Sequence, residues 1–262
     1  MRKIAFLTIL TALIMTSCCN QSQKEKAAIA KLDTMFQELY PADEPGAAVL
    51  ILKGDEIVYD KGFGIADLET GAKIDGNTFF NIASVSKQFT AVAMLQLAEQ
   101  GKISLQDPVK KYFPEFQADF FNDITIAHLL SHTSGIGDYR PREDRDFVLY
   151  ATDEQCYKYM ETLDKLHFTP GTEYQYMNPT FQLCYIIIQK VTGQSFEQYM
   201  KENIFTPAGM DQTVYFSPDK NIPNMSHAYI PVEEKESASN TDSDRTPEAQ
   251  AAAKKQQESA PV

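Results

Sequence analysis

The sequence predicts an α+β fold, in which helices pack on an antiparallel sheet. Three observations indicate it: apolar residues at helical spacing over 29–39, an apolar hairpin over 47–63, and a series of amphipathic helices after residue 84. Together they predict one mixed domain, in which the hairpin is the only clear part of the sheet.

The first elements are a helix and a hairpin. The apolar face of the helix has 3-4-3 spacing and consists of Ile29, Leu32, Phe36 and Leu39. Pro41–Gly46 ends this helix. Ala47–Lys53 is then a predicted strand, Gly54-Asp55 a two-residue turn, and Glu56–Phe63 the returning strand.

The later elements are predicted to be mainly helical. Predicted helices cover residues 85–101, 125–131, 152–163, 180–191 and 196–204, and residues 109–113 form a short segment. Gly101 and Gly193 end two of the helices, because glycine readily adopts the left-handed conformation found there. Pro179 suits a first helical position and Ser195 an N-cap.

Four regions follow one another along the chain. Residues 1–17 resemble an export signal, because two positive charges precede an apolar run that is too short to span a bilayer. Residues 18–27 form a polar tether and residues 28–232 the folded domain. Residues 233–262 contain no Leu, Ile, Phe, Tyr or Met, so they cannot bury enough apolar surface to offset ordering entropy and are predicted to be disordered.

Met15-Thr16-Ser17-Cys18 resembles a bacterial lipobox, in which Cys18 becomes the lipidated first residue. The alternative is an ordinary cleaved signal. The lipobox predicts an exported protein, anchored by lipid to the bacterial cell envelope on the periplasmic side or at the cell surface.

Composition argues against several classes of protein. The net charge is −12 and no basic block follows the signal region, which argues against nucleic-acid binding. The four histidines form no grouping typical of a metal site, so neither a metal nor another cofactor is expected. Cys184 is expected to be a buried free thiol, and a Cys156–Cys184 bridge is the alternative. The sequence identifies no protein partner.

Ser84-Val85-Ser86-Lys87 is the motif with the clearest chemical meaning. Residues three apart on a helix share a face, so the serine hydroxyl and the lysine amine point the same way. A serine near the positive end of the helix dipole, beside an amine that takes its proton, can act as a nucleophile. The alternative is a helix cap followed by a solvated lysine.

The spacing alone is weak, because about one Ser-x-x-Lys is expected by chance in a chain of this composition. A second occurrence, Ser217-Pro218-Asp219-Lys220, lies in a Pro-Asp turn where no helix is expected. Only the first occurrence precedes an apolar helical run, which favours Ser84 and Lys87.

Tyr176-Met177-Asn178 is a second candidate motif. Residues two apart in an extended segment point to the same side, which would let the phenol and the carboxamide face one cavity. A neighbouring ammonium would lower the pKa of the phenol and let it accept a proton. The amide can donate to and accept from a peptide-like substrate. The alternative is a turn tyrosine with a helix-capping asparagine before Pro179.

Five sequence motifs carry a wider resemblance by their order and spacing. They are Asn81–Thr90, Gly101–Pro108, Leu129–Gly135, Pro170-Gly171-Thr172 leading into Tyr176-Met177-Asn178, and Pro207–Met210. They resemble the serine β-lactamase and penicillin-binding protein family, in the branch of class C β-lactamases, D-alanyl-D-alanine carboxypeptidases and related esterases. The resemblance covers about residues 30–230 and implies the α/β sandwich of the β-lactamase/transpeptidase type.

The resemblance also implies roles for the matched positions. Ser84 would be the acylated nucleophile, and Lys87 and Tyr176 would share the general-base and general-acid work. Asn178 would hold the amide of the substrate, and His132 would be a structural loop residue. The implied acyl substrates are D-alanyl peptides, β-lactams or small esters.

The third motif of the family, Lys-Thr-Gly or His-x-Gly on a strand near the C-terminus, is absent from this sequence. This departure predicts a C-terminally truncated domain with the Ser84 N–H as a lone oxyanion donor, and losing one donor typically lowers the rate by about 10²–10³-fold. The expected function is a serine hydrolase that forms an acyl-enzyme and is impaired by this loss. The alternatives are a non-catalytic binding module of the cell envelope and an inactive truncated product.

Overall fold

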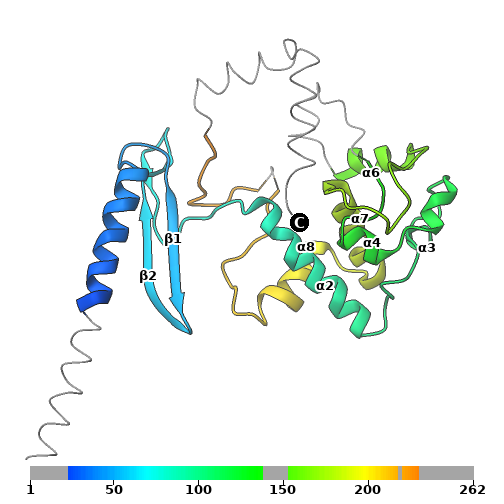
Figure 1. Cartoon of the computed structure of the whole chain (residues 1–262), viewed down its shortest axis with the longest axis horizontal. Coiled ribbons are helices and arrows are strands. Elements are labelled where there is room, and N and C mark those ends of the chain that lie inside the picture. The colour runs from blue at the N-terminus through cyan, green and yellow to red at the C-terminus, as the bar shows by residue number, and fades with distance from the viewer. Residues whose placement is uncertain (1–22, 138–152, 218–219, 230–262) are drawn as a thin grey trace, which may run out of the picture. The chain divides into compact units, whose positions relative to one another are not determined.

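A computed structural model describes residues 23–137, 153–217 and 220–229. The chain divides into two compact units, one of residues 1–81 with 221–262 and one of residues 82–220. Figure 1 shows their helices and strands. The first unit contains antiparallel strands and the second is helical, which confirms the predicted α+β class.

The first unit is built on the predicted hairpin. β1 (Ala47–Lys53) pairs antiparallel with β2 (Glu56–Phe63), and Ala47 lies opposite Phe63. Gly54 in the connecting turn has a φ of +62°, a conformation that glycine adopts without strain. The turn and both strands therefore confirm the prediction, with one irregularity in register between Ile51 and Leu52.

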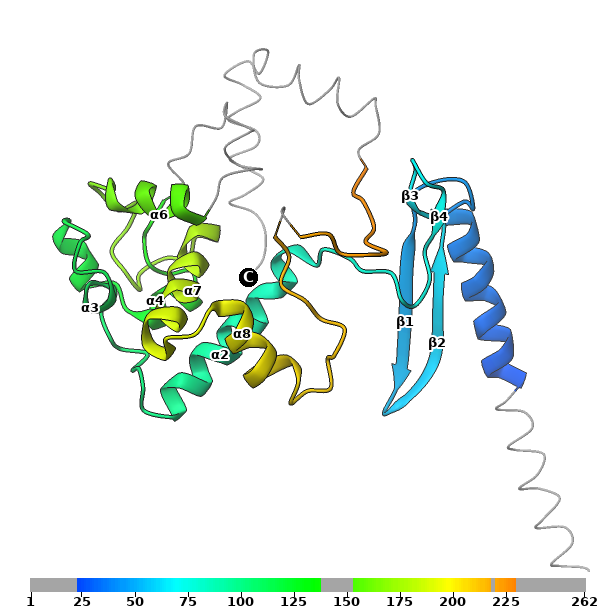
Figure 2. The ribbon, with the colours of Figure 1, turned by 180° about the vertical axis from the view of Figure 1, so that it is seen from behind.

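A helix over residues 23–39 lies along this hairpin in both views (Figures 1 and 2). The ring of Phe36 lies 5.5 Å from the ring of Phe63 and 6.3 Å from that of Tyr59. The two strand side chains are buried, so the predicted apolar face of the helix does cover the hairpin. Leu39, predicted on the same face, instead lies exposed at the last helical residue.

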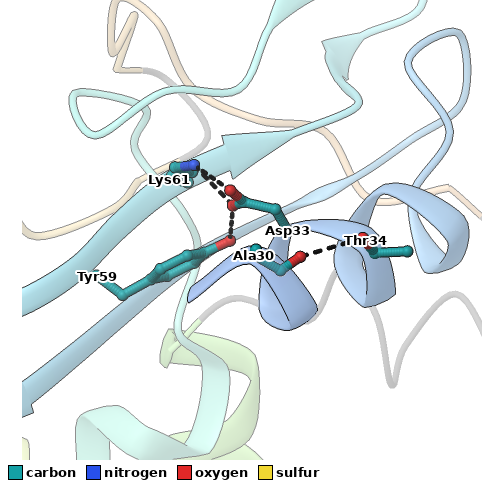
Figure 3. A network of polar contacts seen from close by, with 5 residues as sticks. All are labelled: Ala30, Asp33, Thr34, Tyr59 and Lys61. Carbon is teal, nitrogen blue, oxygen red and sulfur yellow. Dashed lines mark hydrogen bonds and ion pairs between the residues drawn. The ribbon is translucent and has the colours of Figure 1, made fainter. Parts of the chain in front are cut away.

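A polar network also links this helix to β2 (Figure 3). The Asp33 carboxylate accepts hydrogen bonds from the Tyr59 hydroxyl at 2.7 Å and from Lys61 Nζ at 2.6 and 2.8 Å. The bond from Lys61, and then that from Tyr59, hold the pKa of Asp33 below its ordinary value. Burial, followed by the bond to Asp33, raises the pKa of Tyr59 to about 12. The network fixes the helix at one position along the strand.

A second, smaller hairpin completes the first unit. β3 (Ile65–Asp67) pairs antiparallel with β4 (Ala72–Lys73). The segment 221–229 joins it, because the Ser226 N–H donates to the Phe79 carbonyl at 2.8 Å and the His227 N–H to the Ala66 carbonyl at 2.9 Å. The sequence does not predict these strands, because two or three residues are too few for a periodic signal.

The second unit is helical. It contains the 3-10 helix Ala83–Ser86, α2 (Lys87–Glu99), α3 (Val109–Tyr112), the 3-10 helix Asp119–Asn122, α4 (Ile126–Leu130), α6 (Asp153–Glu161), α7 (Asn178–Thr192), α8 (Phe196–Met200) and the π-helical turn Lys201–Phe205. Gly101 and Gly193 take positive φ after α2 and α7, as predicted. The Ser195 hydroxyl caps α8 by accepting from the Gln198 N–H.

Helix α7 lies at the centre of this unit and packs against α2, α4, α6 and α8. Its Leu183 and Ile187 are buried with Leu97 of α2, Leu129 of α4 and Met160 of α6. The packing of α2 against α7 positions the site, because α2 carries Lys87 and the first residue of α7 is Asn178.

An aromatic cluster supports the far end of the same core. The ring of Phe116 is stacked on that of Phe113 at 4.9 Å and also contacts the rings of Phe121 at 4.7 Å and Tyr157 at 5.4 Å. All three phenylalanines are fully buried. Phe116 therefore lies at the centre of the cluster that joins α6 to the segment following α3.

Candidate active site

The predicted serine and lysine meet at the start of α2. Ser84 lies in the 3-10 helix that leads into α2, and Lys87 is the first residue of α2. Lys87 Nζ donates to Ser84 Oγ at 3.1 Å. The preceding residue, Ala83, has a φ of +45°, which is unfavourable for a residue other than glycine. The backbone is thus strained directly before the serine.

Tyr176 and Asn178 complete the group from a segment about ninety residues later in the chain. The Tyr176 hydroxyl donates to Ser84 Oγ at 2.7 Å, and Lys87 Nζ donates to Asn178 Oδ1 at 2.8 Å. All four predicted site residues therefore lie in one hydrogen-bonded network. The N-cap of α7 is Met177 without a side-chain cap, so Asn178 bonds to the lysine rather than capping the helix.

The lysine also sets the electrostatics of the tyrosine. Lys87 Nζ lies 5.0 Å from the centre of the Tyr176 ring. Hydrogen bonding to Lys87, and then to Ser84, holds the pKa of the Tyr176 phenol below its ordinary value of 10.0 despite partial burial. A phenol with a lowered pKa can exchange a proton with the serine hydroxyl, to which it is already bonded.

An open groove begins at Lys87 and Asn178 and runs between α2, α7 and α8. Its lining includes four aromatic residues, Phe181, Tyr185, Phe196 and Tyr215. The polar residues Ser86, Thr90 and Gln182 also line the groove. The rings of Tyr185 and Phe196 lie 4.7 Å apart. The groove therefore offers a largely apolar surface with a few polar groups beside the catalytic candidates.

The second Ser-x-x-Lys is arranged differently. Lys220 Nζ forms an ion pair with the Glu197 carboxylate, and its backbone N–H donates to the Ser217 carbonyl at 2.9 Å. The amine of this lysine is thus engaged with a carboxylate of α8. Among the cysteines, Cys184 is a buried free thiol, as expected, and burial raises its pKa to about 12.

One contact of the site was not predicted from the sequence. The His132 ring lies 4.4 Å from the ring of Tyr176, and its Nδ1 accepts a hydrogen bond from the Met177 N–H at 3.1 Å. The sequence places His132 in a loop motif but gives no sign of this contact, because Met177 lies more than forty residues further along the chain. The contact of His132 with Tyr176 and Met177 is visible only in the three-dimensional structure.

Comparison with known proteins decides the family. A family model described as beta-lactamase matches residues 32–254, which is most of the chain. The chain belongs to the beta-lactamase family. Protein flp of Staphylococcus aureus (strain MW2) is 33% identical over 202 residues, which cover 75% of this chain and 39% of that protein. The chain thus spans about two fifths of the length of this curated relative.

Solved structures from the beta-lactamase family and its relatives share the fold. A penicillin binding protein from Bacillus halodurans has a TM-score of 0.65 at 30% identity, covering 77% of this chain and 61% of its own. D-alanine carboxypeptidase AmpC from Burkholderia cenocepacia has a TM-score of 0.61 at 25% identity, and the match covers 79% of this chain and 54% of the carboxypeptidase chain. These similarities confirm the predicted family and its fold type.

Two further features concern the described residues of this beta-lactamase family member. No three histidine, cysteine, aspartate or glutamate side chains in them lie close enough together to hold a metal ion. None of the helices placed there combines the length and the apolar character needed to cross a bilayer. The predicted lipidation site Cys18, the signal segment 1–17 and the tail 233–262 lie outside the described residues.

Proposed function

We propose that this chain is a serine hydrolase that forms an acyl-enzyme on Ser84. One observation carries the proposal: Ser84 Oγ lies 2.7 Å from the Tyr176 hydroxyl and 3.1 Å from Lys87 Nζ. A weak nucleophile needs an adjacent base within hydrogen-bonding reach, and this arrangement supplies one. The family and the structural neighbours support a hydrolase of the β-lactamase and penicillin-binding type.

In the proposed first step, Tyr176 releases its phenolic proton to solvent, which its lowered pKa favours. The phenolate then takes the proton of Ser84 while Lys87 stays bonded to both Ser84 and Asn178. Ser84 Oγ then bonds to the carbonyl carbon of the substrate, and the bond from that carbon to the leaving nitrogen or oxygen breaks. Tyr176 returns the proton to the leaving group. These steps account for every proton without a metal or cofactor.

In the second step, water attacks the acyl carbon and loses its proton to Tyr176. The bond to Ser84 Oγ breaks, the acid is released, and Tyr176 returns the proton to Ser84 Oγ. The Asn178 amide, at the edge of the groove, is proposed to hold the amide of the substrate. The proposed substrates are D-alanyl peptides, β-lactams or small esters. A neighbour described as a D-alanine carboxypeptidase and one described as a hydrolase with promiscuous acyltransferase activity support this range.

The experiment is covalent labelling with a fluorescent penicillin and a fluorophosphonate. Labelling is expected in the natural chain and is expected to vanish in Ser84→Ala. Ser217→Ala is the matched control, because it removes the serine of the second Ser-x-x-Lys and should leave labelling intact. Folded natural protein that takes up neither probe, or Ser84→Ala that still does, would contradict the proposal.

We further propose that the protein is exported and anchored by lipid at Cys18. The lipobox-like sequence supports this, together with the penicillin-binding proteins among the relatives. Cys18→Ser is expected to move the protein from the membrane fraction to the soluble fraction, because it removes the acylated thiol. The neighbouring Cys19→Ser is the control and should remain with the membrane. Equal fractionation of the two variants would refute lipidation at Cys18.

A further inference from the structure

His132 lies in the loop after α4 and takes no part in the proposed proton transfers. It is 9% exposed and has a φ of +58°, in the left-handed region that few residues other than glycine adopt. A buried, polar side chain on a strained backbone requires an explanation from its contacts.

Two hydrogen bonds connect His132 to the segment that carries Tyr176. The Gln175 N–H donates to the His132 carbonyl at 2.9 Å, and the Met177 N–H donates to His132 Nδ1 at 3.1 Å. In extended backbone, the N–H groups of residues 175 and 177 point to the same side. His132 therefore binds the backbone on both sides of Tyr176. Its carbonyl oxygen accepts one of the two bonds and its ring nitrogen Nδ1 accepts the other.

The same ring packs against the side chains around the site. Its centre lies 4.4 Å from the Tyr176 ring and 5.2 Å from the Phe181 ring. The backbone bonds fix where the Tyr176 residue lies, and the ring contact restricts where its phenol points. Position and direction of the phenol both depend on one histidine.

We propose that His132 is a positioning residue that holds the Tyr176 hydroxyl against Ser84. This inference rests on the proposed function. It assigns His132 the neutral form with the proton on Nε2, because only an unprotonated Nδ1 accepts the bond from Met177.

The charged and titratable groups that face the ring agree with a neutral histidine. They are Lys87 from α2, and Tyr176 and Tyr174 from the segment before α7. Burial, and then the charge of Lys87, hold the pKa of His132 below its ordinary value of 6.5. Protonation would turn Nδ1 into a donor that faces the Met177 N–H, and so break the bond.

A dependence of stability on pH follows. Below pH 6.5 the unfolded chain binds a proton at this histidine before the native protein does. The contribution of His132 to stability is therefore constant above about pH 6.5 and declines as the pH falls from there to the native pKa. In His132→Asn this decline is expected to be absent.

Three substitutions of His132 distinguish the loss of the Nδ1 hydrogen-bond acceptor from an effect of the strained backbone. Asn places an oxygen where Nδ1 lies and tolerates positive φ. Gly suits the backbone but has no acceptor, and Gln moves its acceptor one bond further out. The maximal rate of Ser84 labelling by the fluorophosphonate is expected to fall on the order of 10²-fold in His132→Gly and His132→Gln, as for a small misplacement of a catalytic group. His132→Asn should react about tenfold faster than His132→Gly, since its hydrogen bond is retained.

The matched control is His167→Ala. His167 Nδ1 also lies near this segment, at 2.8 Å from Gln175 Oε1, which is a side-chain atom and not a backbone group of the segment. His167 is an exposed residue, and its ring also lies beside Gly137. Labelling by His167→Ala should stay within about twofold of the natural chain. The concentration of probe that gives half-maximal labelling should change little in any of the variants, because His132 does not line the groove beside Lys87 and Asn178.

A second measurement does not depend on activity. The ¹⁵N resonances of His132 should show an unprotonated Nδ1 and a protonated Nε2 at pH 7, and the pKa of Tyr176 should rise in His132→Gly but less in His132→Asn. A proton on Nδ1, or equal labelling rates in the Asn, Gly and Gln variants, would overturn the inference. Absence of labelling in the natural chain would overturn the proposed function, while the resonances would still test the position of Tyr176.

Discussion

In a Lys87→Met variant, we expect acylation of Ser84 to fall by about 10²–10⁴-fold, the usual contribution of positioned acid–base groups. Methionine keeps a similar length and removes the three donors and the charge. The hydrogen bonds of Lys87 to Ser84 and Asn178 are then lost together. The measurement is the rate of labelling at saturating fluorophosphonate.

The same variant should change two titrations. Lys87 lowers the pKa of both Tyr176 and His132, so both pKa values should rise when the charge is removed. The absorbance of the phenolate and the NMR signals of the imidazole measure them directly. Lys102→Met removes an exposed lysine beyond the end of α2 and should change neither. Unchanged titration of Tyr176 in Lys87→Met would refute the proposed electrostatic coupling.

Phe116→Ala is expected to lower the free energy of unfolding by about 3–5 kcal/mol, the range for deleting a fully buried phenylalanine ring. The ring contacts three other aromatic rings and has no exposed surface, so the cavity cannot be filled by a small shift of one neighbour. Urea denaturation followed by circular dichroism measures the change.

The matched control for this loss is Phe216→Ala. Phe216 belongs to the same unit but is 43% exposed, so its removal should cost much less. If both variants were destabilised equally, the stability of this unit would not come from the aromatic cluster. The comparison also bears on function, because this unit carries Ser84, Lys87 and Asn178.

Local elements of the fold could be predicted well from the sequence. The hairpin over β1 and β2 ends at the predicted residues, because a Gly-Asp turn between two apolar runs permits one register. The last turns of α2 and α7 were likewise predicted, because Gly101 and Gly193 allow the positive φ found there. These signals are contained within a few neighbouring residues.

The site could be predicted only in part. The proximity of Ser84 and Lys87 follows from helical spacing. The bonds from Tyr176 to Ser84 and from Lys87 to Asn178 join residues about ninety positions apart, which only the resemblance assigned to one site. The contact of His132 with Met177 has no local signal at all. From the residues alone, a helix cap was the alternative for Asn178, and the bond from Lys87 across the packing of α2 against α7 separates the two.

The loop that contains His132 also contacts residues 167–168, upstream of Tyr176. The Gly135 carbonyl accepts from the His167 N–H at 2.8 Å, and a Cβ at Gly135 would lie 2.1 Å from the Phe168 carbonyl oxygen. Gly135 also has a φ of +75°, so any side chain there would both strain the loop and push the segment away. In a library of random variants selected for covalent labelling, position 135 should therefore tolerate no replacement, although it contributes no atom to the chemistry.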